Sequence, residues 1–396
     1  MVENAAHEAL RDEATAFLDE HLPKWKAQEG LEELADLDRE QRRSLQRYLF
    51  DHGWGVPTWP EEFGGRGLGM VESLIWNQCK AAAGLQFTFD FVGMGLAGPT
   101  IIARGTPEQK SKYLDKIASG DEAWCQLFSE PGAGSDLSAL STRAERHGDT
   151  WIVNGQKVWS SGALESDRGL LIARHDPDLP KQQGLVFLLL DMHAPGVEVR
   201  PLRQIDGGAH FAEVFFNDVE VPDADRVGEP GEGWSVAMTT LLHERSSIGG
   251  GIGSFAMPFE QVVDLARRSG KSGDPLVRQR LVDVFTRKKI LDVLNTRVQS
   301  KLLSGQIPEA EGSVIKILMA QLGTATATSA IELLGPAGTL ADGPGSPQQR
   351  FLGMASLHIG GGTDEVQRNA IAERVLGLPR EPRPDKEVPF KETRRS

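Results

Sequence analysis

The stretch CQLFSEPGAGSDLSAL, Cys125 to Leu140, separates two kinds of sequence pattern. Before it, from residue 7 to about 120, apolar residues recur at spacings of three and four, which predicts helices. After it, as far as about residue 232, come the short β-rich runs TWIVNGQKVWS, LLIAR, LVFLLLDM and AEVFFNDVEVP, with Asn154-Gly155 expected at a turn. The quoted stretch therefore predicts the entry loop of a β-domain.

Long helical patterns return from Gly233 to about residue 377, and a Pro-rich, charged stretch follows them. The sequence thus predicts an α+β multidomain protein with a helical N-terminal domain (1–122), a middle β-domain (123–232) and a C-terminal helical bundle (233–378). We expect residues 379–396 to form a mobile tail, because they are charged and lack apolar periodicity.

One helix boundary is sharply marked in the segment GTPEQKSKYLDKIASG. Thr106 suits the N-cap, Pro107 the first helical position and Gln109 the third, which is the pattern of a capping box. Gly120 suits the C-terminal end of this helix. The sequence therefore predicts a helix that begins after Thr106 and ends at Gly120.

Composition limits the class of protein. The 396 residues carry a formal net charge of −13 and two cysteines, Cys79 and Cys125. Dispersed basic residues on an acidic chain disfavour a nucleic-acid surface, and cysteines outside any CxxC pair fit a reducing compartment. The polar N-terminus lacks the apolar core of a signal peptide, and no apolar run approaches the roughly 20 residues of a spanning helix. We expect a soluble, cytoplasmic protein that binds neither nucleic acid nor membrane.

The order of six motifs along the chain indicates a protein family. The motifs are EPGAGSD, NGQKVWSSG, EVFFNDVEVPDADRVGEPGEGW, LLHER, ELLGPAGTL and GGTDEVQRNAIAERVLG. With them the chain resembles the acyl-CoA dehydrogenase family over residues 10 to 378. The resemblance implies a helical N-terminal domain, a middle β-barrel and a C-terminal four-helix bundle. It also implies non-covalently bound FAD, an acyl-CoA substrate, an electron-transfer flavoprotein as electron acceptor, and assembly as a homotetramer or a hetero-oligomer.

The resemblance assigns four residues of the β-domain to the flavin and the substrate. Ser129 matches the hydroxyl residue that binds the flavin ring, and Ser135 matches a serine beside the CoA pantetheine. Trp159 matches an aromatic residue that packs on the ring, and Ser161 matches a threonine near flavin N5. The alternative for Trp159 is an ordinary core aromatic. Glu130, in the same motif as Ser129, is expected to hold the loop.

The adenine and pyrophosphate pocket departs from the family pattern. Arg267 or Arg268 could take the place of the family's arginine, but the phenylalanine that follows it is absent here. Glu332 stands where the family has glutamine, and Pro336 replaces its second glycine, whereas Gly335 still permits close backbone approach to a phosphate. After the glycine run, the resemblance assigns FAD contacts to Thr363 and Glu365.

Most family members carry the catalytic base in a Tyr-Glu-Gly-Thr motif, where this chain has Gly360 and Gly361. A smaller branch has glycine there and places a glutamate on another helix, immediately before an arginine, as Glu244 and Arg245 are placed here. The resemblance therefore implies that Glu244 is the base, that the Gly361 N–H stabilises the enolate, and that Arg245 and Gly360 lie beside the substrate. The alternative is that Glu244 and Arg245 form a solvated helical pair. His243 is a weaker candidate than Glu244 for the catalytic base.

The chemistry implied is removal of an α proton and a β hydride from the thioester, to give the trans-2-enoyl-CoA. The bare Gly360 and the segment SSIGGGIG after Glu244 predict a branched, bulky or medium-to-long acyl chain. Two alternatives stay open. One is a flavin monooxygenase of the same fold, which needs no carboxylate base. The other is a non-catalytic subunit of a hetero-oligomeric dehydrogenase, and the altered FAD motifs favour this alternative.

Overall fold

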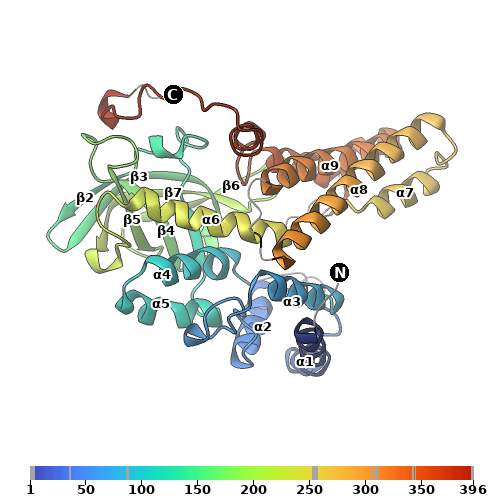
Figure 1. Cartoon of the computed structure of the whole chain (residues 1–396), viewed down its shortest axis with the longest axis horizontal. Coiled ribbons are helices and arrows are strands. Elements are labelled where there is room, and N and C mark those ends of the chain that lie inside the picture. The colour runs from blue at the N-terminus through green and yellow to red at the C-terminus, as the bar shows by residue number, and fades with distance from the viewer. Residues whose placement is uncertain are drawn as a thin grey trace. The chain divides into compact units, whose positions relative to one another are not determined.

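The computed structural model describes residues 5–34, 37–85, 89–251, 257–304, 306, 311–340, 343 and 345–393, and the side chains of 245–251 and 302–303 lie outside it. The chain forms two compact units, whose residue ranges can be followed by the colour bar in Figure 1. Unit 1 contains Met1–Arg203, Ala209–Ser246 and Arg383–Ser396, and unit 2 contains Gln204–Gly208 and Ser247–Pro382. Each unit is described by itself below.

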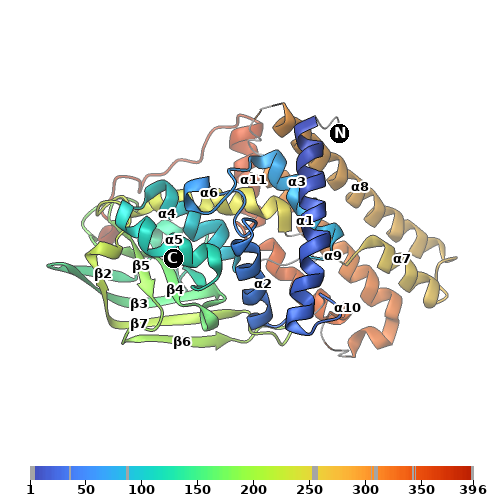
Figure 2. The ribbon, with the colours of Figure 1, turned by 90° about the horizontal axis from the view of Figure 1, so that it is seen from below.

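Unit 1 begins with the predicted helical region. Its helices are α1 (Ala5–Glu29), α2 (Arg39–Asp51), α3 (Met70–Ala82), α4 (Gly98–Arg104) and α5 (Pro107–Ser119), and α1 packs on α3 (Figure 2). The predicted boundaries of α5 are confirmed. The Thr106 hydroxyl accepts from the Gln109 N–H, the Gln109 side chain accepts from the Thr106 N–H, and Gly120 ends the helix with a φ of 82°.

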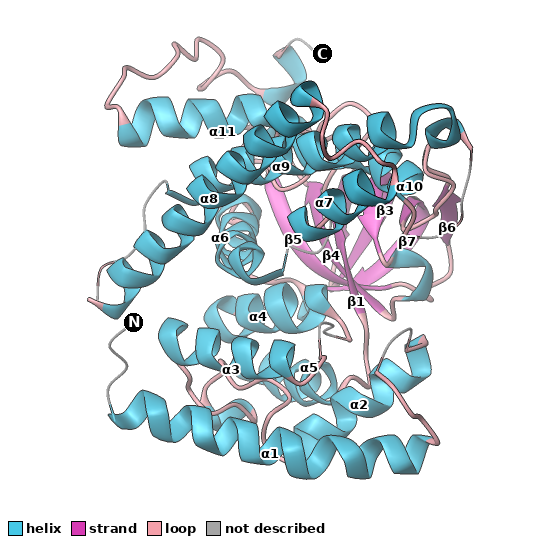
Figure 3. Cartoon of the chain, turned by 90° about the vertical axis from the view of Figure 1, so that its right-hand side faces the viewer, coloured by secondary structure: helices cyan, strands magenta, loops and turns pink. Residues whose placement is uncertain are grey.

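The β-domain is one seven-stranded sheet (Figure 3). Its strands are β1 (Trp124–Leu127), β2 (Arg143–His147), β3 (Thr150–Ser161), β4 (Arg168–Arg174), β5 (Leu185–Asp191), β6 (Val197–Leu202) and β7 (Phe211–Pro222). The order is β1-β4-β2-β3-β7-β6, with β5 paired to β4. The expected β-barrel thus takes the form of a curled sheet, in which no pairing among the described residues joins β5 to β6.

The prediction of a turn at Asn154-Gly155 was wrong, because β3 runs through both residues. The register of β3 on β7 shifts between Val153 and Gly155, which marks a bulge. Gly155 has a φ of 149°, and a side chain there would meet the Thr142 Oγ1 at 2.6 Å. Residues that suit a hairpin turn also suit a bulge, since both need unusual backbone geometry.

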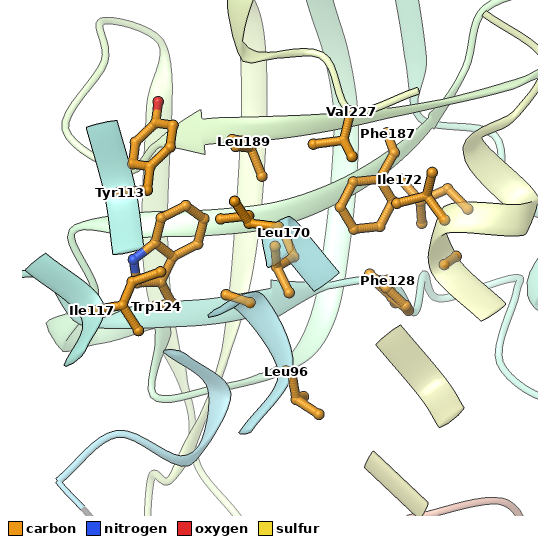
Figure 4. Packing of buried hydrophobic residues seen from close by; sticks show 14 of the residues in the cluster. Leu96, Tyr113, Ile117, Trp124, Phe128, Leu170, Ile172, Phe187, Leu189 and Val227 are labelled. Atoms are coloured by element: carbon orange, nitrogen blue, oxygen red, sulfur yellow. The ribbon is translucent and has the colours of Figure 1, made fainter. Parts of the chain in front are cut away.

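One buried cluster of unit 1 lies between the sheet and the helices that cover it (Figure 4), and further clusters lie within the sheet and among α1, α2 and α3. Ile117 of α5, Trp124 of β1 and Phe187 of β5 belong to one buried cluster. The same cluster includes Val236 and Ala237, from the first turns of helix α6 (Gly233–Gly251). We expected α6 to belong to the C-terminal bundle (233–378). The first part of this helix, up to Ser246, instead belongs to unit 1.

Unit 2 is helical, as predicted. Its helices are α7 (Phe259–Arg268), α8 (Pro275–Leu303), α9 (Glu311–Leu334), α10 (Pro347–Gly353) and α11 (Asp364–Ala370). Helix α9 contacts all four of the others. A smaller apolar cluster that includes Val262, Ala266, Ala330 and Leu333 joins α7 to α9.

One helix departs from the expectation that no apolar run approaches spanning length. Among the described residues, Glu311–Thr339 is apolar and long enough to cross a membrane, with a mean hydropathy of 1.3. Valine, isoleucine, leucine and alanine supply this score. The signal is weak, because a core helix passes the same test. Lys316 within it is buried and pairs with Asp364 of α11 at 3.1 Å, as in a core helix.

The described part of the C-terminal tail makes contacts that its composition did not indicate, and its mobility stays a prediction. It packs on the loop between β4 and β5 in unit 1. The Phe390 N–H donates to the Leu179 carbonyl at 2.9 Å, and the Phe390 ring is buried. Composition indicated mobility because the tail has no apolar periodicity. One well-placed aromatic side chain nevertheless gives it an anchor.

Candidate active site

The EPGAGSD loop is fixed at its start by Glu130. This carboxylate is buried and accepts from the Ser141 N–H at 2.7 Å, the Thr142 N–H at 2.9 Å and Lys157 Nζ at 2.8 Å. Burial works against the charged form, but the Lys157 ammonium and these donors outweigh burial and lower the pKa of Glu130. Glu130 therefore stays ionised and holds the loop, as expected from the sequence.

Ser129 and Trp159 lie on adjacent backbone segments. The Val158 N–H donates to the Ser129 carbonyl at 2.9 Å, and Trp159 follows at a second bulge of β3. Trp159 is 57% exposed and has a φ of 60°, a conformation that costs a non-glycine residue free energy. The alternative of an ordinary core aromatic is thus excluded. An exposed, strained aromatic is typical of a binding site.

Two hydroxyls follow Trp159. Ser160 is buried, and among the described residues its Oγ has no hydrogen-bond partner. Ser161 is exposed and pairs with Phe211 of β7 through the backbone. Ser135, in the EPGAGSD loop, is also exposed. Unit 1 therefore brings Ser129, Trp159 and Ser161 together and presents Ser135 on an exposed part of the loop.

Helix α6 places Glu244 one turn beyond a buried anchor. Thr240 is fully buried and forms a hydrogen bond of 2.9 Å with Thr100 of α4, through their hydroxyls. Glu244 is half-buried, and its neighbour His243 has a pKa lowered by burial. Arg245 belongs to the helix, but its side chain lies outside the described residues. The backbone of α6 thus holds Glu244 on a rigid support.

The glycine run in unit 2 is exposed at Gly360 and Gly361, and a side-chain amide holds its backbone. Gln367 Nε2 donates to the Gly361 carbonyl at 2.7 Å. Gly361 and Gly362 have φ values of 65° and 86°, so side chains at both positions would be strained. Gln367 is buried and belongs to the GGTDEVQRNAIAERVLG motif, yet sequence reasoning missed it.

Helix α11 follows the glycine run directly. Thr363 is its N-cap and accepts from the Val366 N–H at 3.2 Å. Glu365 is exposed and pairs with Arg368 at 3.1 Å. Asp364 between them is buried, with His358 Nδ1 at 2.7 Å and Lys316 Nζ at 3.1 Å. The hydroxyl of Thr363 therefore caps the helix, whereas the Glu365 side chain points to solvent.

The residues assigned to the adenine and pyrophosphate pocket lie on α7 and after α9. Arg267 and Arg268 are exposed at the end of α7, and Arg267 pairs with Asp264 at 3.0 Å. Glu332 forms an ion pair with Arg280. Gly335 has a φ of 61°, and Lys271 Nζ lies 3.8 Å from where its Cβ would be. Lys271, which the sequence did not indicate, thus adds a cation near the glycine, while Arg280 compensates the charge of Glu332.

Comparison with known proteins decides the family. The chain matches the N-terminal (residues 4–121), middle (125–219) and C-terminal (231–376) domain profiles of acyl-CoA dehydrogenases. It is 41% identical over 349 residues to acyl-CoA dehydrogenase IpdE1 of Mycobacterium tuberculosis, which covers 86% of this chain and 89% of that one. The chain belongs to the acyl-CoA dehydrogenase family.

Solved structures of acyl-CoA dehydrogenases share this fold. The Tcur3481-Tcur3483 steroid ACAD has a TM-score of 0.78 and 30% identity, and the match covers 96% of this chain and 99% of that chain. The ChsE4-ChsE5 complex from Mycobacterium tuberculosis has a TM-score of 0.76 and 31% identity, over 96% and 100% of the two chains. An acyl-CoA dehydrogenase domain order of helices, curled sheet and helices is therefore established for this chain.

FAD is the cofactor of acyl-CoA dehydrogenases, and the described residues fit it. The exposed Trp159 ring beside Ser129 offers an apolar face with a polar neighbour, which suits a flavin ring. In unit 2, Gly335 has no side chain and Lys271 supplies a cation beside it, which suits a phosphate. Within the described part of the chain, no cluster of three or more metal-ligating side chains occurs.

Proposed function

We propose that this acyl-CoA dehydrogenase oxidises an acyl-CoA thioester to its trans-2-enoyl form, with Glu244 as the base. The observation that supports the proposal is that the chain lacks a carboxylate at one position of the family pattern and has one at the alternative position. Gly361 offers no carboxylate where most of the family has one, while Glu244 stands half-buried on a helix whose preceding turn is locked against α4.

Each step of the proposed reaction is assigned to particular groups of the chain. The Glu244 carboxylate takes the α proton, and the electron pair of the broken C–H bond passes into the thioester as an enolate. The Gly361 N–H stabilises the enolate oxygen, and Gln367 orients that peptide through the neighbouring carbonyl. Bound FAD supplies the acceptor of the β hydride. Ser129, Trp159 and Ser161 would hold its ring, while Gly335, Thr363 and one of Arg267 and Arg268 would contact its remainder.

The substrate class proposed is a bulky acyl chain. The absence of side chains at Gly360 and Gly361 leaves room beside the reacting carbons. The relatives whose printed names refer to steroids support a large, branched or ring-bearing acyl group over a short linear one. Ser135 would contact the pantetheine of CoA from the EPGAGSD loop. The electron acceptor we propose is an electron-transfer flavoprotein.

Anaerobic titration of the FAD-loaded protein with acyl-CoAs of different size tests this proposal. Bulky acyl-CoAs should bleach the flavin of the wild type, and Glu244→Gln should slow bleaching about 10²–10⁴-fold. His243→Gln is the matched control on the same turn and should bleach at the wild-type rate. Thermal melts of all three proteins would separate a catalytic loss from unfolding. Equal bleaching by wild type and Glu244→Gln would remove Glu244 as base.

A second candidate function is that of one subunit in a hetero-oligomeric dehydrogenase. The names of two similar structures, Tcur3481-Tcur3483 and ChsE4-ChsE5, each join two chains. Glu332, where the family has glutamine, favours this candidate, since it puts a carboxylate near the predicted phosphate site. Purification of the chain alone tests it. A colourless chain that turns yellow only with a second subunit would support it, and a yellow homotetramer would exclude it.

The flavin monooxygenase alternative predicts a different measurement. A monooxygenase needs no carboxylate base, so Glu244→Gln would leave its turnover intact. Rapid reaction of the reduced protein with oxygen, together with incorporation of an oxygen atom into the product, would favour it. Slow reaction with oxygen and an enoyl product would favour the dehydrogenase.

A further inference from the structure

The C-terminal tail is fastened to the loop that joins β4 to β5 (Figure 1). The N–H groups of Phe390 and Lys391 donate to the carbonyls of Leu179 and Pro177 at 2.9 Å and 3.0 Å. Lys391 Nζ also lies 2.5 Å from the Asp178 carboxylate. The tail therefore has a defined register on unit 1.

Beneath the tail, Arg174 connects it to the EPGAGSD loop. The Phe390 ring lies 3.7 Å from the Arg174 guanidinium carbon, which is a cation–π contact. Arg174 is buried and donates to the Ser138 carbonyl at 2.7 Å and the Leu140 carbonyl at 3.1 Å, at the end of that loop. Burial lowers the pKa of Arg174 to about 10, so the side chain remains charged at neutral pH.

Lys181 makes a second connection between the tail and the loop. Its Nζ lies 2.8 Å from the Asp385 carboxylate of the tail and 3.0 Å from the Asp136 carboxylate of the loop. The hydrogen bond to Asp385, followed by that to Asp136, raises the pKa of Lys181. Asp136 is the residue next to Ser135, which is expected beside the CoA pantetheine.

The loop is packed at Ala133 but open around Ser135. Ala133 is buried and exchanges backbone hydrogen bonds with Glu130, whereas Gly132 and Gly134 have no heavy atom within 4 Å of where a Cβ would lie, and Ser135 is exposed. An exposed segment that contains glycine samples many conformations unless its ends are held. Glu130 holds one end through Lys157, and Arg174 and Lys181 hold the other.

We propose that Asp385 and Phe390 are positioning residues for acyl-CoA binding, which act on Ser135 and its loop through Lys181 and Arg174. The role of Ser135 in this proposal rests on the proposed function. Because the loop would touch the CoA moiety and not the reacting carbons, loss of either residue should weaken ground-state and transition-state binding equally. Such uniform weakening raises KM and leaves kcat nearly unchanged.

The test compares three substitutions in the FAD-loaded, full-length protein. Asp385→Asn removes the charge that Lys181 binds, and Phe390→Leu removes the ring over Arg174 but keeps most of its volume. Lys391→Ala is the matched control, since it breaks the tail's ion pair with Asp178, which does not touch the loop. Hydrogen exchange of the Ala133–Leu140 amides and steady-state kinetics with a bulky acyl-CoA are measured for each.

Asp385→Asn and Phe390→Leu should speed amide exchange in the loop and raise KM about three- to tenfold, with kcat within twofold of wild type. Asp385→Glu should restore both values, and Lys391→Ala should change neither. Unchanged loop exchange in Asp385→Asn and Phe390→Leu would overturn the proposal, as would faster exchange with an unchanged KM. Failure of the wild type to oxidise any acyl-CoA would instead contradict the proposed function, and the exchange data would still report on the loop.

Discussion

Lys157 Nζ lies 2.8 Å from Glu130 Oε1, and this buried contact joins the loop that carries Ser129 to the strand that carries Trp159. Both side chains are buried, and Lys157 also donates to the Phe128 carbonyl at 2.9 Å. The two segments that we assign to the flavin ring are thus held by one ion pair as well as by backbone hydrogen bonds. A role in folding and a role in cofactor binding are therefore coupled at this point.

Replacement of Lys157 by methionine should destabilise the protein by about 3–5 kcal/mol, because the Glu130 carboxylate stays buried without its cation. The double variant Glu130→Gln/Lys157→Met should recover most of that loss. Urea unfolding of the apo-protein measures both effects. Equal stability of the single and double variants would contradict the coupling.

Trp159→Gly should have opposite effects on stability and on cofactor binding. Glycine relieves the positive φ of 60°, which costs a tryptophan about 1–3 kcal/mol. Because the ring is largely exposed, little burial is lost, and the apo-protein should be at least as stable as the wild type. FAD should bind more weakly, whereas Trp159→Phe should keep most of the affinity. Thermal melts and flavin fluorescence titration check the pair, and unchanged FAD affinity in Trp159→Gly would contradict the assignment.

Gln367→Met should lower kcat by about tenfold or more, because the Gly361 peptide loses the donor that fixes its carbonyl. KM should change less, since the same peptide is expected to act mainly on the developing enolate. Stopped-flow reduction of the flavin by substrate measures the chemical step directly. Asn369→Ala, at an exposed position of the same helix, is the control for stability. A change confined to KM would argue against a role for this peptide in the transition state.

Asp90 predicts a pH dependence of stability. Burial raises the pKa of this carboxyl to about 6, although the backbone N–H groups of Gly93 and Trp124 oppose the rise. The folded state therefore holds a proton that the unfolded state releases near pH 4. The stability due to protonated Asp90 is complete below about pH 4 and is lost as the pH rises through 6. A shift of this size corresponds to about 3 kcal/mol.

Comparison with Asp90→Asn isolates that group. The difference in free energy of unfolding between wild type and variant should change by up to about 3 kcal/mol between pH 4 and pH 7, since the amide does not titrate. Groups common to both proteins cancel in the difference. Urea denaturation at several pH values gives the curve. A difference that is constant with pH would contradict the raised pKa.

The sequence predicted the features that depend on local signals. The order of helices, β-domain and helices followed from periodicity, and the ends of α5 followed from Thr106 and Gly120. The contacts of Glu130 with Lys157 and of Phe390 with Arg174 could not be predicted, because they join residues far apart in the chain. Gly155 was misread for a related reason, since the same residue types serve turns and bulges.

In the candidate site, too, some features could be predicted from the sequence and others depend on the folded backbone. The resemblance pointed to Ser129 and Trp159, and the structure brings their backbones together. It gave no sign that Trp159 has a positive φ or that Gln367 holds Gly361, since both are properties of the folded backbone. Whether Glu244 is the base stays a prediction, for which the titration above is the measurement.

The tail has a consequence for the order in which the protein is made. Unit 1 is assembled from residues up to Ser246 and from Arg383 onward, so its last part leaves the ribosome after unit 2. At about 5–20 residues per second, synthesis of the intervening stretch takes roughly seven to twenty-seven seconds. During that time the EPGAGSD loop lacks Asp385 and Phe390. The nascent chain can therefore form the sheet early, yet the EPGAGSD loop gains these two supports only after the residues of unit 2 have been synthesised.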